Sequence, residues 1–413
     1  MVHSDDGDLA LEHRHESGVL AVFVYLVLPV LLDPVAEQIL AVVVLVLLGF
    51  FLHAALVLVF VLGLGKSGAV HRDEAEDDDT PEIVLKKQLR DDFDVVAFTH
   101  ADKDHIQGST DFFWLQHAEK YQGKDRIKIG ELWVPAAMVV ESASNDEQSA
   151  EFIILRQEAR HRLLEGKGIR VFSKPQALKD WLEPALRARN EKPDARDHLI
   201  VDAGTLVPGF SLDADKAEFF CHSPFIEHCD GGDIVRNSAS LVFNVRLKSG
   251  SEIFDYLEVG DAEWRDLEDI VTTTRLHKND DRLKWDLFNI PHHCSYLALS
   301  DEKGEKETVP KPLIKELLLE GREGAYIVSC SKPVNDDKSA YDQVQPPHIQ
   351  ARKAYESHLK EVAGRKFLVT MSEPNATKPK PLEFEFTSTG LSLKKSVVVG
   401  AAAIITTTAP RAG

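Results

Sequence analysis

The run HADKDHIQGS at 100–109 contains side chains well suited to bind a cation. It places His100, Asp102, Asp104 and His105 close together, directly after the apolar run DVVAFT. Carboxylates this close repel one another, and a solvated turn does not need two imidazoles. A positive ion among them removes the repulsion, and imidazole with carboxylate suits Zn²⁺ and also Mn²⁺ or Fe.

Three later segments offer further ligands, and each lies at the end of a predicted strand. Asp261 ends EIFDYLEVGD, His292 and His293 follow DLFNIP, and His222 lies in AEFFCHSP. Each motif alone is most often a turn, a helix cap or an ordinary histidine. Together they predict a pair of metal ions about 3.5–4 Å apart that lowers the pKa of a bound water towards 7.

The elements that must position these residues alternate along the chain. Strands are predicted at 94–99, 126–135, 217–224, 240–247, 252–261, 286–291, 325–330 and 366–371, with a hairpin at 382–393. Helices are predicted at 81–93, 110–122, 146–168, 174–190, 262–271, 309–321 and 346–362. This alternation predicts an α/β protein with helices outside stacked mixed sheets.

The N-terminal part, 1–80, is predicted to be a hydrophobic segment with an acidic linker, followed by a catalytic domain at 81–395 and a tail at 396–413. Its apolar runs lie at 17–32 and 39–65. The second run exceeds the roughly 20 residues that span a bilayer, so a membrane helix is the favoured interpretation of 18–65. Buried Val-rich strands are the alternative, and a segment outside the fold is a third. No basic n-region or cleavage site indicates a signal peptide.

Composition limits the classes of partner. The net charge is −19 and no basic stripe stands out, so tight binding of duplex nucleic acid is not expected. A small-molecule or single-stranded phosphoester remains compatible with a local metal-centred pocket. The four cysteines form no CxxC pair, which favours a reducing compartment for the catalytic part. We therefore expect a cytoplasmic catalytic domain, either membrane-associated through 18–65 or free of the membrane.

At these residues the chain resembles the metallo-β-lactamase fold, and within it the hydrolase domain associated with the ComEC/Rec2 competence proteins. The resemblance covers about 85–395. The family motif HxHxDH is matched by 100–105, with Asp102 in place of the second histidine, and the family's Asn/Ser stretch by 237–243. Its GD motif is matched at 260–261, and its PHHGS motif at 291–295, where Cys294 replaces glycine.

The resemblance implies an αββα sandwich with two Zn²⁺ per chain, or Mn²⁺ or Fe in their place. It implies that one ion is held by His100, Asp102 and His222, that the other is held by Asp104, His105 and His293, and that Asp261 bridges them. His228 is a rival for the place of His222, and His292 for that of His293. In this scheme His292 faces the substrate, and Asp104 and His292 are the expected catalytic residues.

The function expected from the residues and the resemblance is a dinuclear metal-dependent hydrolase. Its substrate would be a phosphodiester or nucleotide-type molecule, attacked by metal-activated hydroxide. The alternative is a membrane-anchored binding or regulatory protein with a vestigial metal site, which the substitution at Asp102 motivates.

Overall fold

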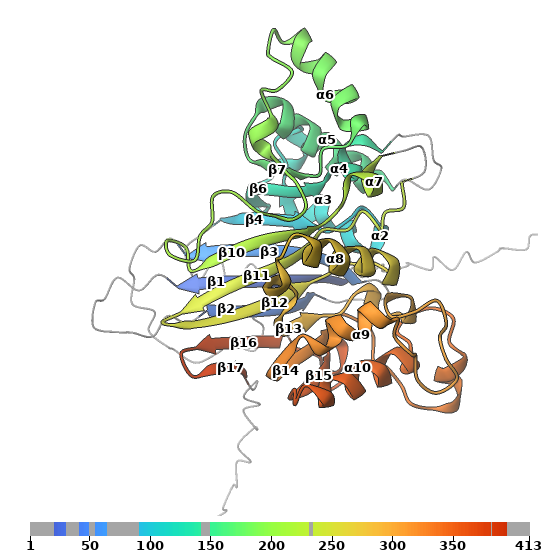
Figure 1. Ribbon diagram of the computed structural model, residues 1–413. Coiled ribbons are helices and arrows are strands. Elements are labelled where there is room, and N and C mark those ends of the chain that lie inside the picture. Colours follow the sequence, from blue (N-terminus) through green and yellow to red (C-terminus); the bar gives the residue numbers. More distant parts are fainter. Residues whose placement is uncertain are drawn as a thin grey trace, which may run out of the picture.

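The computed structural model describes residues 20–29, 41–48, 54–63, 91–141, 149–230, 234–380 and 382–394. These residues form a mixed α/β structure with two sheets (Figure 1). The first sheet has the strand order β17-β16-β2-β1-β3-β4-β6-β7-β8, with β5 beside β6. Its strands are β1 (Leu20–Pro29), β2 (Ala41–Leu48), β3 (Ala54–Gly63), β4 (Asp92–Phe98), β5 (Phe113–Trp114), β6 (Ile127–Pro135), β7 (Ile169–Phe172), β8 (Ile200–Val201), β16 (Leu382–Thr387) and β17 (Gly390–Leu393).

The second sheet has the order β15-β14-β13-β12-β11-β10-β9. Its strands are β9 (Thr205–Leu206), β10 (Ala217–Ser223), β11 (Val242–Ser249), β12 (Glu252–Glu258), β13 (Trp285–Asn289), β14 (Gly321–Ser329) and β15 (Lys366–Val369). Strands β12 to β15 are mutually parallel. Their carboxyl ends therefore open at one edge of the sheet, where ligands bind in open α/β sheets.

The helices follow the sequence signals for starts and stops. They are α2 (Lys103–Ile106), α3 (Ser109–Phe112), α4 (Ala136–Val140), α5 (Ala150–Glu165), α6 (Gln176–Ala188), α7 (Ile226–Cys229), α8 (Trp264–Leu276), α9 (Pro312–Leu319) and α10 (Ile349–Glu361). In α5 the Ser149 hydroxyl accepts a hydrogen bond from the Phe152 amide, and the helix ends at Gly166 with φ 76°. The helix predicted at 146–168 is confirmed.

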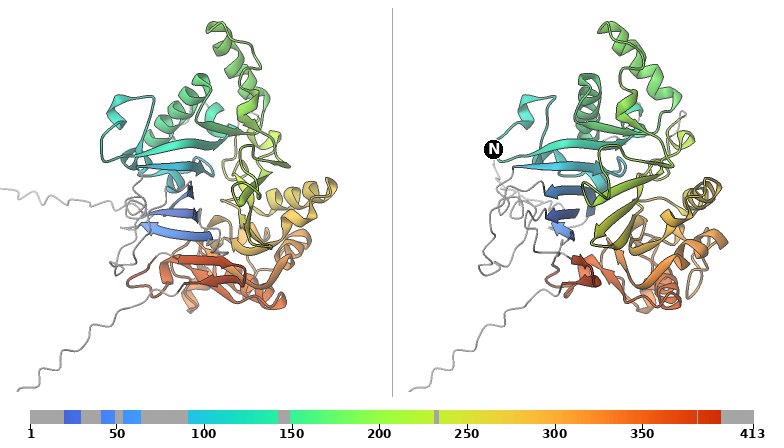
Figure 2. Two further views of the ribbon diagram at one scale, coloured as in Figure 1. Left: turned by 90° about the vertical axis from the view of Figure 1, so that its left-hand side faces the viewer. Right: turned by 60° about the vertical axis from the view of Figure 1, so that its left-hand side comes forward.

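The two sheets face each other across a shared apolar core (Figure 2). Trp133 of β6 lies at its centre, and its ring is 5.2 Å from Phe219 of β10 and 5.6 Å from Phe243 of β11 between centroids. Successive residues of β4 alternate between this core and a second one: Val95 belongs to the shared core and Val96 to the cluster that includes α5. A third cluster joins the second sheet to α8, α9 and α10.

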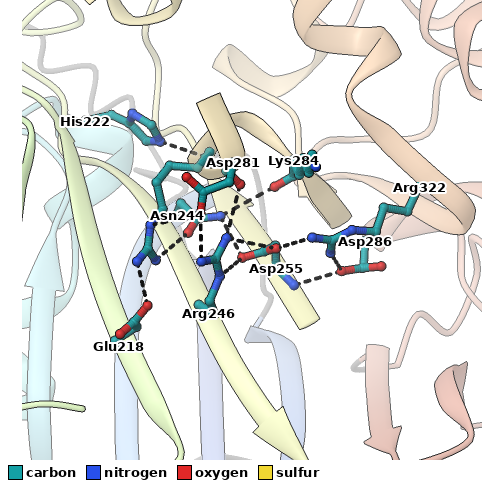
Figure 3. A network of polar contacts seen from close by, with 10 residues as sticks. Glu218, His222, Asn244, Arg246, Asp255, Asp281, Lys284, Asp286 and Arg322 are labelled. Carbon is teal, nitrogen blue, oxygen red and sulfur yellow. Dashed lines mark hydrogen bonds and ion pairs between the residues drawn. The ribbon is translucent and has the colours of Figure 1, made fainter. Parts of the chain in front are cut away.

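A buried polar network lies on the second sheet (Figure 3). Asp255 of β12 is fully buried and accepts hydrogen bonds from Arg246 Nε at 2.7 Å and from Arg322 Nη2 at 2.5 Å. Asp286 of β13 accepts a further bond from Arg322 and one from the Asp255 amide. A buried carboxylate is tolerated when it is paired and hydrogen-bonded in this way.

The structure corrects the favoured interpretation of 18–65. Its described residues form strands β1, β2 and β3, which is the strand alternative, and not membrane helices. β1 pairs antiparallel with β2 and parallel with β3. β3 also pairs antiparallel with β4, and β2 with β16. Val-rich runs favour strands because β-branched side chains fit a pleated sheet. Among the described residues, no helix has the length and apolarity needed to cross a bilayer.

Most of the remaining element predictions are confirmed, including the strands β12 to β15 and the C-terminal hairpin of β16 and β17. The helix predicted at 110–122 is wrong: α3 ends at Phe112 and the chain continues as the short strand β5. For the helix predicted at 81–93, residues 81–90 lie outside the described part, and β4 begins at Asp92. The tail at 396–413 also lies outside it.

The shared core predicts a large cost for truncating its central ring. Trp133→Ala removes a fully buried indole, and we expect the free energy of unfolding to fall by about 3–5 kcal/mol. Urea unfolding followed by far-UV circular dichroism measures the change. Leu276→Ala is the control, because the Leu276 side chain is 76% exposed. Equal losses in both variants would contradict the packing described.

Candidate metal centre

The candidate site forms where three strands from both sheets end. β4 of the first sheet leads to His100 and on to α2, which carries Asp104 and His105. In the second sheet β12 leads to Asp261, and β13 leads to His293. The site therefore joins the two sheets at their carboxyl edges, as the sequence pattern predicted.

Gly260 allows these strand ends to approach one another. Its φ is 57°, and a Cβ placed on it would lie 3.1 Å from Ser240 Cβ and 3.2 Å from Thr99 Cβ. The surrounding backbone is tied together by three hydrogen bonds: the Leu241 amide donates to Thr99 O, the Asp261 amide to Ser240 Oγ, and the His292 amide to Gly260 O. A glycine is required here both for the left-handed conformation and for the close contact.

Asp104, His105, Asp261 and His293 form a compact group in which one ligand atom from each residue lies within 4.8 Å of the others. His105 Nε2 lies 3.2 Å from Asp261 Oδ1. His293 Nε2 lies 3.3 Å from Asp104 Oδ2 and 3.6 Å from Asp261 Oδ2. Asp261 is thus shared between the two histidines, as a central ligand would be.

Outer hydrogen bonds orient the imidazoles toward the group. His293 Nδ1 donates to the Cys330 carbonyl at 2.8 Å, which directs its Nε2 to the two aspartates. His105 Nδ1 and His100 Nδ1 each lie 3.2 Å from Thr99 Oγ1. Fixing one ring nitrogen in this way sets the tautomer of the other, and is the usual arrangement around histidines that bind metals.

The donor set fits a divalent metal ion. The Nε2 atoms of His100, His105 and His293 are buried and have no hydrogen-bond partner of ordinary geometry among the described residues. A buried imidazole nitrogen without a partner is costly unless a ligand satisfies it. Two imidazoles and two carboxylates match the preferences of Zn²⁺, Mn²⁺ or Fe²⁺.

The local electrostatics are those of a site prepared for a cation. Burial opposes ionisation of Asp261, but the His105 and His293 imidazoles outweigh it and hold the Asp261 pKa well below its ordinary value. Burial likewise lowers the pKa of His293, yet Asp261 and Asp104 raise it overall to about 9. The proton on His293 therefore offsets part of the carboxylate charge, and a metal ion would displace that proton on binding.

His100 and Asp102 lie beside this group. His100 Nε2 is 3.7 Å from Asp102 Oδ2 and 4.0 Å from Asp261 Oδ2. Burial, together with the neighbouring His105, lowers the pKa of His100 to about 3, so the ring is neutral. Asp102 is partly exposed, and its Oδ1 accepts a hydrogen bond from Arg236 Nη1 at 3.2 Å.

Arg236 and its second partner, Glu141, were not anticipated from the sequence. Arg236 Nη2 donates to Glu141 Oε1 at 2.7 Å, and Arg236 Nε lies 3.1 Å from Glu141 Oε2. The one available signal was position, since Arg236 directly precedes Asn237 in the matched Asn/Ser stretch. Glu141 follows α4 and carried no motif.

The structure does not bring His222 to the group, and its expected role as a ligand is corrected. His222 Nε2 donates to the Arg282 carbonyl at 3.1 Å, and Nδ1 lies 3.1 Å from the Thr274 hydroxyl on α8. Figure 3 shows the ring beside the Asp255 network. Cys221 belongs to the shared core, whereas the His222 ring contacts Thr274 of α8, at a point where the register of β10 against β11 shifts. The rival His228 lies 3.9 Å from Asp266 of α8.

His292 and Cys294 flank His293. His292, His293 and Cys294 have φ values of 51°, 52° and 68°, so the strained backbone turns one histidine into the group and the other outward. His292 Nδ1 lies 4.0 Å from Glu263 Oε1, at the rim of the site. Cys294 Sγ faces the His348 carbonyl, and burial raises its pKa, which keeps it a neutral thiol.

Comparison with known proteins adds no relationship: no family model and no curated protein matches this chain. The site is therefore interpreted from its own residues.

The position of His222 predicts a pH effect on stability. Burial lowers its pKa to about 4, whereas the unfolded chain titrates near 6.5. The unfolded chain thus takes up a proton that the folded chain refuses, and the free energy of unfolding falls by roughly 3 kcal/mol between pH 7 and 4. We expect His222→Gln to remove most of this loss in denaturant titrations at each pH.

His198→Gln is the control, because it makes the same substitution at an exposed histidine. His222→Gln should also bind as much metal as wild type. A reduced metal content in that variant would restore His222 as a ligand.

Proposed function

We propose that this protein is a metal-dependent hydrolase that cleaves phosphodiester or nucleotide-type substrates. The convergence of Asp104, His105, Asp261 and His293 from two sheets carries the proposal. Chance clustering of acids is common on surfaces, but here three buried imidazole Nε2 atoms accompany them that have no hydrogen bond of ordinary geometry among the described residues. Perturbed and buried titratable groups at a strand-end site are typical of catalysis.

The residues of the site would have three different roles. Asp104, His105, Asp261 and His293 would hold the cation, which when bound supplies a water nucleophile at neutral pH by lowering the pKa of that water to about 7. The Cys330 carbonyl and Thr99 hydroxyl hold the imidazoles in position. His292, at the rim, is placed to donate a hydrogen bond to an oxygen of the substrate that gains charge.

The proposed architecture is the αββα sandwich of the metallo-β-lactamase fold. Two observations support it: strands of both sheets share one apolar core, and separate clusters join each sheet to its own helices. The strands β1 to β3 supply the part of the first sheet that precedes the HxHxDH-like motif. The motif at 100–105 then occupies the end of β4, as the resemblance implies.

The proposal predicts that Asp261→Asn loses both metal and activity. We expect the purified full chain, loaded with Zn²⁺ or Mn²⁺ and dialysed, to retain metal and to hydrolyse bis-p-nitrophenyl phosphate. Asp261→Asn keeps the size of the side chain but removes the shared negative charge. It should lose more than about a hundredfold in turnover, because even residues outside the ligand set cost 10–100-fold in metal sites.

Asp213→Asn is the matched control, because the Asp213 side chain is 94% exposed and pairs only with surface lysine in the described contacts. It should keep wild-type metal content and turnover. A folded wild-type chain that retains no metal would refute the proposal. Retained metal with no turnover across a panel of esters and phosphoesters would favour the binding or regulatory alternative.

A further inference from the structure

The place of a second cation is incomplete in this chain. A second ion beside the Asp104, His105, Asp261 and His293 group would draw on His100 and Asp102, but His222 is directed to α8. Asp102 stands where the matched motif has a histidine. Its Oδ1 is already bound to a fixed positive charge, the guanidinium of Arg236.

We propose that the centre binds a single metal ion and that the Arg236 guanidinium takes the place of the second cation, where it binds a phosphoryl oxygen of the substrate. This inference rests on the proposed function for the identity of the site, and it narrows the substrate to phosphate esters. Guanidinium is suited to the role because its planar N–H donors match phosphate geometry.

Arg236 pairs with two carboxylates and still has N–H donors without a partner among the described contacts. Glu141 accepts hydrogen bonds from Arg236 Nε and Nη2, and Asp102 accepts one from Arg236 Nη1. Its guanidinium also packs over the Phe152 ring, 5.0 Å from the centroid. A guanidinium has five N–H donors, so two remain without a partner among the described contacts. The side chain is 20% exposed, so the guanidinium is not fully enclosed by the described residues.

Charge also argues against a second ion. The Asp102 carboxylate is already paired with the Arg236 guanidinium. A dication at His100 and Asp102 would lie close to that guanidinium and be repelled by it. A substrate phosphate is negatively charged, so the same guanidinium and a bound metal ion would both attract it. Its several oxygens would allow it to contact both at once.

Metal stoichiometry is the first test. We expect calorimetric titration of the metal-free full chain with Zn²⁺, checked by elemental analysis after dialysis, to show one tight equivalent. Two tight equivalents would overturn the proposal.

Binding of inorganic phosphate to the metal-loaded chain is the second test. Arg236→Gln should weaken phosphate by about ten- to hundredfold while leaving the single metal equivalent in place, since a hydrogen bond to a charged group is lost. Arg236→Lys keeps the charge but not the planar fork, and should also bind phosphate more weakly than wild type. Arg187→Gln is the control, because that side chain is 68% exposed on α6.

Arg236→Lys retains the positive charge beside Asp102 and Glu141. If the glutamine variant melts far below wild type, phosphate affinity is compared between Arg236→Lys and wild type instead. Unchanged phosphate affinity in a folded Arg236 variant would overturn the proposal. These binding measurements need no turnover. One metal equivalent with Arg236-dependent phosphate binding, but no hydrolysis, would keep this inference and remove the proposed enzymatic activity.

Discussion

The close approach of the Gly260 backbone to Thr99 and Ser240 determines whether the metal-binding group can exist. It is the point where the end of β12 meets the end of β4, and so where the second sheet is aligned with the first. Metal sites tolerate errors of only about 0.2 Å in ligand distance. A methyl group at Gly260 would have to displace two Cβ atoms, and the displacement would pass directly to Asp261, its neighbour in sequence.

The same arrangement requires the fold to bury charge. Asp261 is 4% exposed and His105 is fully buried. A buried charged pair is often no more stabilising than apolar residues of similar size would be at the same positions. Before any ion binds, the aspartates raise the pKa of His105 and raise that of His293 to about 9, which favours positive charge beside them. The apolar core around Trp133 must offset this cost. Binding of an ion to the proposed site would therefore be coupled to folding, because the ion would replace protons at the site.

Sequence patterns predicted the strands whose ends build the site, and hence the meeting of Asp104, His105, Asp261 and His293. They could not separate strand from helix in 18–65, because a continuous apolar run has no period to read. Nor could they place His222, since one step along β10 decides between the strand-end site and α8. Arg236 was missed for another reason: a guanidinium has no metal-ligand signature, and its role depends on two carboxylates that are distant in sequence.

An acidic chain with a phosphate-binding centre is physically consistent because the two effects act over different distances. Surface charges are screened beyond about 8–10 Å at ordinary salt, whereas a metal ion and Arg236 would act on a small ester in direct contact. A duplex presents one charge per roughly 1.7 Å over many turns, so it would meet the net charge of −19 outside the site. Under the proposed function, the net charge would therefore favour small or single-stranded esters, whose few phosphates could lie within reach of the site.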